Sequence, residues 1–227
     1  YDTPFFFSSN ALKQVGYLTV ELKKIYRQQD EQFISLLNQI RENKASEETL
    51  QALNQRYIPN FVPPKEGNYI RLTTHNAPAQ YINEQQLAAL PAQTYSFTAE
   101  VEGNFPESSY PADFKLILKP GAQVMFIKND PQHRFYNGMI GEVIGVKTDE
   151  NGSKIIVRSK DSGEELELEK MEWTNAKYTL NEKTKEIEET VEGKFMQYPL
   201  RLAWAITIHK SQGLTFEHAI IDASHSF

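Results

Sequence analysis

The sequence contains no cysteine, and this absence removes several kinds of chemistry at once. Without a thiol there can be no disulfide framework, no thiolate zinc site and no cysteine nucleophile. The chain also has no apolar run of membrane-spanning length, and its N-terminus lacks the basic-then-apolar order of a signal peptide. We therefore expect no membrane association and no secretion, and we expect a cytoplasmic location.

An excess of positive charge is missing as well. The chain carries 24 Lys plus Arg against 30 Asp plus Glu, which gives a formal net charge of −6. A protein that holds nucleic acid through a global basic surface has the opposite balance. Any nucleic-acid binding must therefore come from local groups, and some cationic residues do lie in segments with few acids: Arg27, Arg71, Arg201, His209 and Lys210.

The composition is that of a folded protein. Hydrophobic residues make up 40% and aromatic residues 11% of the 227 residues, with only 11 Gly and 11 Pro. A disordered or low-complexity chain has fewer apolar and more breaking residues. The length suits one large domain or two small ones.

Strands and helices alternate in the first part of the chain. Residues 1–7 are expected to be extended, and Leu18–Ile25 is expected to be a short strand. Asp30 is a candidate N-cap for a helix whose apolar stripe faces a core, and Ser46 is a candidate cap for a second helix. A further strand at Tyr69–Thr73 precedes another helix, so this part predicts an α/β layer.

Short strands separated by tight turns dominate the middle of the chain. The candidate strands are Leu116–Leu118, Val124–Ile127, Glu142–Val146, Ile155–Arg158 and Leu166–Trp173. Asn137-Gly138, Asn151-Gly152 and Ser162-Gly163 are turn signals between them. This pattern predicts a small antiparallel barrel, with the charged segment Lys177–Gly193 as an exposed hairpin on it.

The α/β pattern returns near the end of the chain, where Ala219–Ile221 is an apolar strand. We therefore expect one α/β domain in two parts, interrupted by the β-barrel. The predicted boundaries are 1–118 for its first part, 119–194 for the inserted barrel and 195–227 for its second part.

The segment Ala205–Phe216 is dense in polar groups. A candidate buried strand is followed by hydroxyl, imidazole and ammonium groups, before Gly213 permits a sharp exit of the backbone. The polar residues are Thr207, His209, Lys210 and Ser211. Such a set suits phosphate binding, but the alternative is a capped helical turn whose side chains only satisfy backbone groups.

This segment resembles motif V of superfamily 1 helicases, and the string His-Lys-Ser-Gln-Gly-Leu-Thr is similar to that of the Pif-type and RecD-like branch. Leu22–Phe33 resembles motif IV of that branch, and Leu72–Asn76, with Ala79 and Asn83 beyond, resembles the next family motif. Pro120–Met125 with Tyr136–Gly138 is similar to the family's inserted Src-homology-3-like barrel. The resemblance covers most of the chain.

The resemblance implies a fold and an activity. The fold would be a RecA-like α/β domain of the P-loop NTPase type, lacking the P-loop half, with an inserted small antiparallel β-barrel. The activity would be that of the C-terminal motor half of an ATP-dependent DNA helicase. Such an enzyme couples ATP hydrolysis to 5′ to 3′ movement on single-stranded DNA and to unwinding, in DNA repair and recombination. The partners implied are single-stranded and forked DNA, ATP and an N-terminal RecA-like domain.

The resemblance assigns three residues to the nucleotide. Arg27 would be catalytic, because a permanently charged guanidinium can grip the γ-phosphate from a neighbouring domain. The alternative for Arg27 is a surface salt bridge to Asp30 or Glu31. Gln28 would orient Arg27 or touch the nucleotide, with a solvated amide as the alternative. Gly213 would lie in the turn nearest the nucleotide.

The DNA-binding residues are expected at two places. Thr74, His75 and Asn76 lie where a strand ends and a helix begins, and backbone N–H groups and the helix dipole favour a phosphate there. The alternative is that Thr74 or Asn76 only caps the helix. The resemblance assigns the DNA backbone also to Thr207, His209, Lys210 and Ser211. Relatives of the UvrD type have a glutamate where Thr215 stands, so no ribose contact is assigned to it.

The 227 residues contain no Gly-x-x-x-x-Gly-Lys-[Ser/Thr] phosphate loop, since Gly193-Lys194 is followed by Phe195. No acidic pair for Mg²⁺ is recognised either. We expect ATP and Mg²⁺ to be held mainly by the N-terminal half of the enzyme, with no cofactor and no metal in this chain alone. A second hypothesis is a non-catalytic nucleic-acid-binding or interaction module with a degenerate motor fold.

Overall fold

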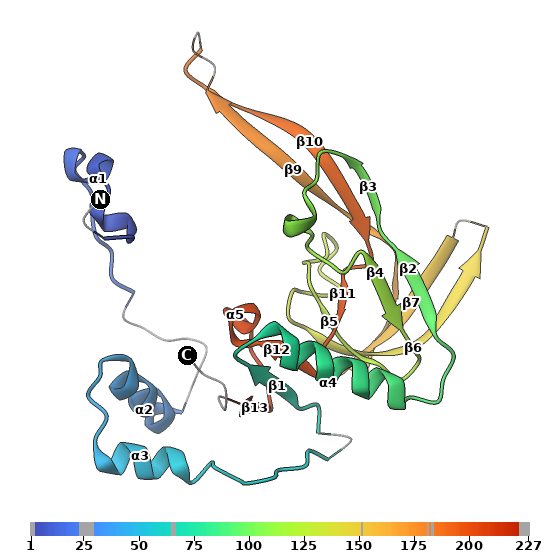
Figure 1. The fold of residues 1–227 in the computed structure, drawn as a ribbon, viewed down its shortest axis with the longest axis horizontal. Helices are drawn as coiled ribbons and strands as arrows, with labels where there is room; N and C mark the ends of the chain where they lie inside the picture. Colours follow the sequence, from blue (N-terminus) through green and yellow to red (C-terminus); the bar gives the residue numbers. More distant parts are fainter. Residues whose placement is uncertain are drawn as a thin grey trace. The chain divides into compact units, whose positions relative to one another are not determined.

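The computed structural model describes residues 3–22, 30–64, 67–150, 152–180, 182 and 184–222. The chain divides into two compact units, Tyr1–Phe61 and Val62–Phe227 (Figure 1). The second unit contains all the strands that the structure describes.

The first unit is helical where it is described. Its elements are η1 (Phe6–Ser8), α1 (Asn10–Gln14), α2 (Glu31–Arg41) and α3 (Glu47–Asn54). The expectation of an extended segment over residues 1–7 is wrong from Phe6 onwards, where a 3₁₀ turn begins. The predicted strand at Leu18–Ile25 is absent over residues 18–22, which pair with no strand among the described residues. Residues 23–25 lie outside the described part of the chain.

The caps of the two longer helices are confirmed. The Asp30 carboxylate accepts a hydrogen bond from the backbone N–H of Phe33 at 3.0 Å. Ser46 and Thr49 form a reciprocal capping box at the start of α3. The expectation that the apolar stripe of α2 faces a core is wrong, because no residue of α2 is buried and Leu37 remains 42% exposed.

A parallel sheet lies in the second unit, with strand order β12-β1-β13. Its strands are β1 (Ile70–Thr73), β12 (Ala205–Thr207) and β13 (Ala219–Asp222), and helix α4 (Asn76–Ala89) packs against β1 and β12. The predicted strand at 69–73 and the helix that follows it are therefore confirmed. Within the described residues, no helix combines the length and apolar character needed to cross a membrane.

Antiparallel strands make up most of the rest of the second unit. A five-stranded sheet has the order β11-β5-β6-β7-β8. Its strands are β5 (Gln123–Phe126), β6 (Ile140–Asp149), β7 (Gly152–Ser159), β8 (Glu165–Leu168) and β11 (Leu200–Leu202). The pairing has two ends, β11 and β8, and among the described residues no strand pairing closes it into the predicted barrel.

Two smaller antiparallel sheets accompany it. One pairs β2 (Tyr95–Thr98) with β4 (Lys115–Leu118), and the 3₁₀ turn η2 (Glu107–Ser109) lies between them in the sequence. The other has the order β3-β10-β9, with β3 (Glu100–Gly103), β9 (Met171–Leu180) and β10 (Ile187–Gln197). The hairpin predicted within 177–193 is present, but it belongs to this three-stranded sheet.

The predicted strand at Leu166–Trp173 is split between β8 and β9, which belong to different sheets. Lys170, between the two strands, turns its ammonium towards β3. It donates to the carbonyl of Thr98 at 2.9 Å and forms an ion pair with Glu100 at 2.6 Å. A continuous strand was expected because apolar alternation does not show where a chain passes from one sheet to the next.

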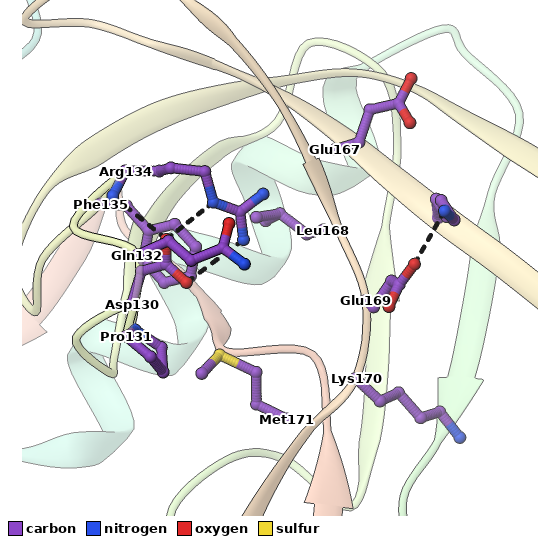
Figure 2. Close-up of a pocket in the computed structure, with 11 residues that line it drawn as sticks. Asp130, Pro131, Gln132, Arg134, Phe135, Glu167, Leu168, Glu169, Lys170 and Met171 are labelled. Carbon is purple, nitrogen blue, oxygen red and sulfur yellow. Dashed lines mark hydrogen bonds and ion pairs between the residues drawn. The ribbon is translucent and has the colours of Figure 1, made fainter.

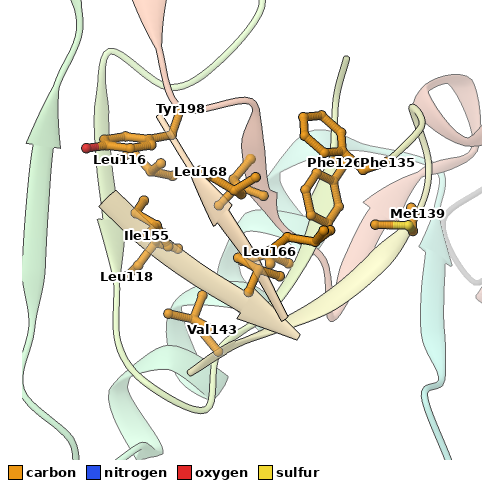
Figure 3. Close-up of a cluster of buried hydrophobic side chains, with 14 residues drawn as sticks. Leu116, Leu118, Phe126, Phe135, Met139, Val143, Ile155, Leu166, Leu168 and Tyr198 are labelled. Atoms are coloured by element: carbon orange, nitrogen blue, oxygen red, sulfur yellow. The ribbon is translucent and has the colours of Figure 1, made fainter. Parts of the chain in front are cut away.

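The main core lies over the five-stranded sheet and draws on β4 through β8, as Figure 3 shows. Apolar side chains alternate along these strands, and the rings of Phe126 and Phe135 lie 4.5 Å apart between their centroids. A second cluster joins the two kinds of sheet, because it holds Met125 and Ile140 together with Ile70 and Ile206. The parallel and antiparallel sheets are therefore packed on each other.

Candidate nucleic-acid interface

Two of the motif segments meet at one edge of the parallel sheet. Thr73 at the end of β1 and Thr207 at the end of β12 are register partners in a parallel pairing. Because both strands end at the same edge, the segments that follow them, 74–76 and 208–211, leave the sheet side by side (Figure 1). The structure thus brings together predicted DNA-binding residues that lie far apart in the sequence.

The first segment begins helix α4. Its N-cap is His75, whose side chain makes no cap hydrogen bond, so the alternative that Thr74 or Asn76 caps this helix is wrong. The Thr74 hydroxyl lies 2.9 Å from Nδ1 of His75, and the Thr73 hydroxyl donates to the His75 carbonyl at 2.9 Å. The side chains of His75 and Asn76 are exposed at the sheet edge.

The second segment forms the short helix α5 (Ile208–Ser211). Thr207 is its N-cap and is buried, and its hydroxyl accepts a hydrogen bond from the backbone N–H of Lys210 at 3.4 Å. The Ser211 hydroxyl donates to the Ile208 carbonyl at 2.8 Å. The hydroxyls of Thr207 and Ser211 thus form hydrogen bonds with the backbone of α5, as the alternative of a capped turn predicted. The side chains of His209 and Lys210, by contrast, are exposed.

The predicted nucleotide residues are only partly placed. Arg27 and Gln28 lie outside the described residues. Gly213 has a φ of +86°, in the left-handed region that favours glycine, and a Cβ built there would meet nothing within 4 Å. The turn at Gly213 is closed by a hydrogen bond from the Leu214 N–H to the Ser211 carbonyl at 3.0 Å.

Asn83 holds the strand that leads into α5. Its amide nitrogen donates to the Ala205 carbonyl at 2.8 Å, and its amide oxygen accepts from the Ala205 N–H at 2.9 Å. β12 lies at the end of the parallel sheet, and no other strand of the described residues pairs with its outer backbone groups. The sequence pointed to Asn83 only as part of a motif, because its partner is 122 residues away.

A cleft of about 470 Å³ continues from this edge between α4 and strands β4, β11 and β12. It is lined by three predicted residues, Asn76, Thr207 and Lys210, and by two cations outside the predicted set, Lys115 and Arg201. Partial burial and then the positive charge of Arg201 lower the pKa of Lys210, while Asp113 opposes this shift. Arg201 stood out in the sequence only as a cation in an acid-poor segment.

Another cavity, of about 450 Å³, lies against β7 and β8 (Figure 2). Its buried Asp130 accepts hydrogen bonds from Arg134 Nε at 2.7 Å and Nη2 at 3.2 Å, and these bonds lower the pKa of Asp130. The other charged side chains that line it also have ion-pair partners, in the pairs Lys154–Glu169, Glu167–Lys147 and Lys170–Glu100. This cavity therefore offers no unmatched charge to a ligand.

Within the described part of the chain, no group of three or more His, Asp or Glu side chains could hold a metal ion. His218 instead packs against Tyr69, with 4.9 Å between the ring centroids. His133 lies in a turn and has a positive φ of 58°.

Comparison with known proteins identifies the class of this α/β protein. No family model matches the chain. The crystal structure of Bacteroides sp. Pif1 in complex with ADP-AlF4 matches 100% of this chain and 51% of that chain, with a TM-score of 0.84 and 39% identity. The same Bacteroides protein bound to ssDNA matches with a TM-score of 0.66 and 39% identity. The mixed α/β fold is thus that of solved helicase structures.

The sequence comparison gives the family. The ATP-dependent DNA helicase Pif1 of Psychrobacter sp. is 33% identical over an alignment 275 residues long, which includes 98% of this chain and 41% of that protein. The chain belongs to the Pif1 helicase family. It spans about half of the solved relative and less than half of the curated one.

Proposed function

We propose that this chain is the C-terminal motor half of an ATP-dependent DNA helicase that moves 5′ to 3′ on single-stranded DNA and unwinds duplexes. The observation that carries the proposal is the meeting of segments 74–76 and 208–211 at one edge of the parallel sheet. Two features add support. The chain spans 41% of its Psychrobacter relative, and it contains no phosphate loop of its own.

The proposed architecture is a RecA-like α/β domain interrupted by a Src-homology-3-like β-barrel. The register shift between Val143 and Gly145 in β6 supports a curved sheet, because such a bulge bends a strand. We place the borders of the insertion near residues 95 and 202 instead of 119 and 194. β2 and β4 precede residue 119 and β11 follows residue 194, yet all three belong to antiparallel sheets.

On the nucleotide side, ATP with Mg²⁺ would be held mainly by a preceding RecA-like domain. Arg27 would reach the γ-phosphate from this half and offset the charge that develops during transfer, and Gln28 would support it. The open space at Gly213 allows the backbone of that turn to approach a nucleotide closely. A reducing compartment such as the cytoplasm fits the absence of cysteine.

On the DNA side, the exposed side chains at the sheet edge would hold the backbone of single-stranded or forked DNA. They are His75 and Asn76 at the start of α4, and His209 and Lys210 in α5. Thr74 would position the His75 ring through their 2.9 Å contact. Thr207 and Ser211 would act through the shape of α5, to whose backbone both hydroxyls bind.

The test compares Arg27→Ala with His209→Ala in the full-length enzyme. Arg27→Ala should reduce ATP turnover by about a thousandfold, as loss of an arginine finger does, while single-strand binding persists. His209→Ala should weaken binding to single-stranded DNA and raise the DNA concentration needed to stimulate ATP hydrolysis. Lys170→Ala, which removes a cation paired with Glu100, is the control. Equal losses of DNA-free ATPase activity in the Arg27 and His209 variants would refute the separate roles.

A further inference from the structure

The cleft between α4 and β4 carries functional groups from several elements. Asn76, Gln80, Asn83 and Leu87 recur at helical spacing on the face of α4 that lines it. Lys115 lines it from β4, and Arg201 from β11. Its volume of about 470 Å³ lies within the range of small-molecule sites. The cleft is therefore a surface of suitable size that begins at the edge described above.

The cations of this cleft differ from most others in the second unit. Elsewhere in that unit, ion pairs with carboxylates occupy Arg71, Arg134, Lys147, Lys154, Arg158, Lys160, Lys170, Lys177 and Lys194. Among the described residues, Lys115, Arg201 and Lys210 of the cleft form no ion pair. Three other described cations of that unit, Lys119, Lys128 and Lys185, also form no ion pair, and two of them, Lys119 and Lys128, donate to backbone carbonyls. The cleft thus brings three cations without a carboxylate partner together in a chain whose net charge is −6.

Arg201 is held in place by one of its donors. Its Nη2 donates to the Pro111 carbonyl at 3.1 Å, which leaves further N–H groups of the guanidinium available. Because Arg201 lowers the pKa of Lys210, the two positive charges repel each other across the cleft. A bound anion would remove this repulsion and accept charge-assisted hydrogen bonds.

The acids of the cleft do not cancel these charges. Glu84 accepts a hydrogen bond from the Gln80 amide at 2.8 Å, and Asp113 only partly offsets the effect of Arg201 on Lys210. With Lys115, Arg201 and Lys210 against Glu84 and Asp113, the charged lining of the cleft has three cations and two anions. The amides of Asn76 and Gln80 add donors and acceptors beside the charges.

We propose that Lys115 and Arg201, together with Lys210, bind a phosphodiester of single-stranded DNA in this cleft. The inference rests on the proposed DNA-binding function and extends its site to residues outside the helicase motifs. The strand would pass from the ends of β1 and β12 along α4 towards β4 and β11. A polymer is favoured over a free nucleotide because the cleft is continuous with the edge through Asn76, Thr207 and Lys210.

The experiment measures the affinity of the full-length protein for a fluorescent oligothymidylate over a range of salt concentrations. The logarithm of the association constant falls linearly with the logarithm of the salt concentration, and for single strands each lost phosphate contact makes this dependence less steep by about 0.7. Arg201→Gln and Lys115→Gln should each reduce the slope by about this amount and weaken binding roughly tenfold at moderate salt. Arg158→Gln is the matched control, because it removes the same charge from an exposed pair with Glu165 at 2.8 Å.

Two further points concern the choice of variants at Arg201 and Lys115. Arg201→Lys should restore most of the slope, because an ammonium also contacts phosphate as a point charge. If Arg201→Gln fails to fold, Lys115→Gln carries the test, since the Lys115 side chain has no hydrogen bond to the described residues.

Slopes equal to that of Arg158→Gln in both variants would overturn the cleft assignment, while weaker binding by His209→Ala would leave the proposed function standing. Competition by thymidine monophosphate as strong as that by the oligonucleotide would overturn the assignment to a strand. Absence of single-strand binding by the unmodified protein would overturn both proposals.

Discussion

Asn83 should be needed for the position of β12, and the structure allows the cost of its loss to be worked out. In Asn83→Ala, both hydrogen bonds to Ala205 disappear, and Ala205 is only 1% exposed. A buried backbone group left without a partner costs about 1–3 kcal/mol. Two such groups, with some relief from water in the neighbouring cleft, should reduce the free energy of unfolding by about 2–4 kcal/mol.

A thermal melt of the protein measures this effect. For a chain of this size, about 3 kcal/mol corresponds to a decrease in Tm of roughly 6–12 °C. Gln86→Ala replaces an exposed residue on the same helix and should change stability by less than about 0.5 kcal/mol. Asn83→Asp should also be destabilising, because a carboxylate cannot donate to the Ala205 carbonyl. If Asn83→Ala melted at the temperature of Gln86→Ala, the idea that these two bonds hold the edge strand would be wrong.

Two further changes test the β-rich part. Gly138→Ala should lower Tm, because Gly138 has a φ of +97° and the new Cβ would lie 2.7 Å from Cδ2 of Leu214. Gly145→Ala is the control and should leave Tm nearly unchanged, because a Cβ at Gly145 would meet nothing within 4 Å. Hydrogen bonds from Arg134 lower the pKa of Asp130 in the folded protein. The Asp130–Arg134 pair therefore stabilises the fold fully at pH values above about 3.9, the ordinary pKa of an aspartate carboxyl group. This stabilisation is lost as the pH falls through the lowered pKa of folded Asp130. In urea unfolding, the stability gap between the unmodified protein and Asp130→Asn should therefore narrow from pH 7 towards pH 2, and a gap independent of pH would contradict this reasoning.

The sequence predicted the features that depend on local chemistry. Asp30 and Ser46 cap helices as expected, because an N-cap and its partner lie within three residues. The strand before Thr74 and the helix after it were equally readable, since apolar alternation gives way to a helical period there. The turns at Gly138 and Gly163 have positive φ, as their Asn-Gly and Ser-Gly signals indicated.

Features that depend on distant partners could not be predicted in this way. The roles of Asn83 and Arg201 became visible only when their carbonyl partners, Ala205 and Pro111, were placed beside them. That β2, β4 and β11 belong to antiparallel sheets was similarly hidden, because alternation reveals a strand but not the sheet that it joins. Arg27 lies outside the described residues, so its role remains a prediction from the motif.

The parallel pairing of β1 with β12 has a consequence for folding. Thr73 and Ile206, which share a hydrogen bond across these strands, are separated by 133 positions in the sequence. Closing so long a loop in an unfolded chain is slow and entropically unfavourable. The antiparallel strands between them can form their own core first, which replaces the flexible loop with a compact bridge. During synthesis the edge formed by β1 and β12 should therefore assemble only after β12 has left the ribosome. Shorter nascent chains should hold a folded β-rich segment without this edge, which we propose to bind DNA.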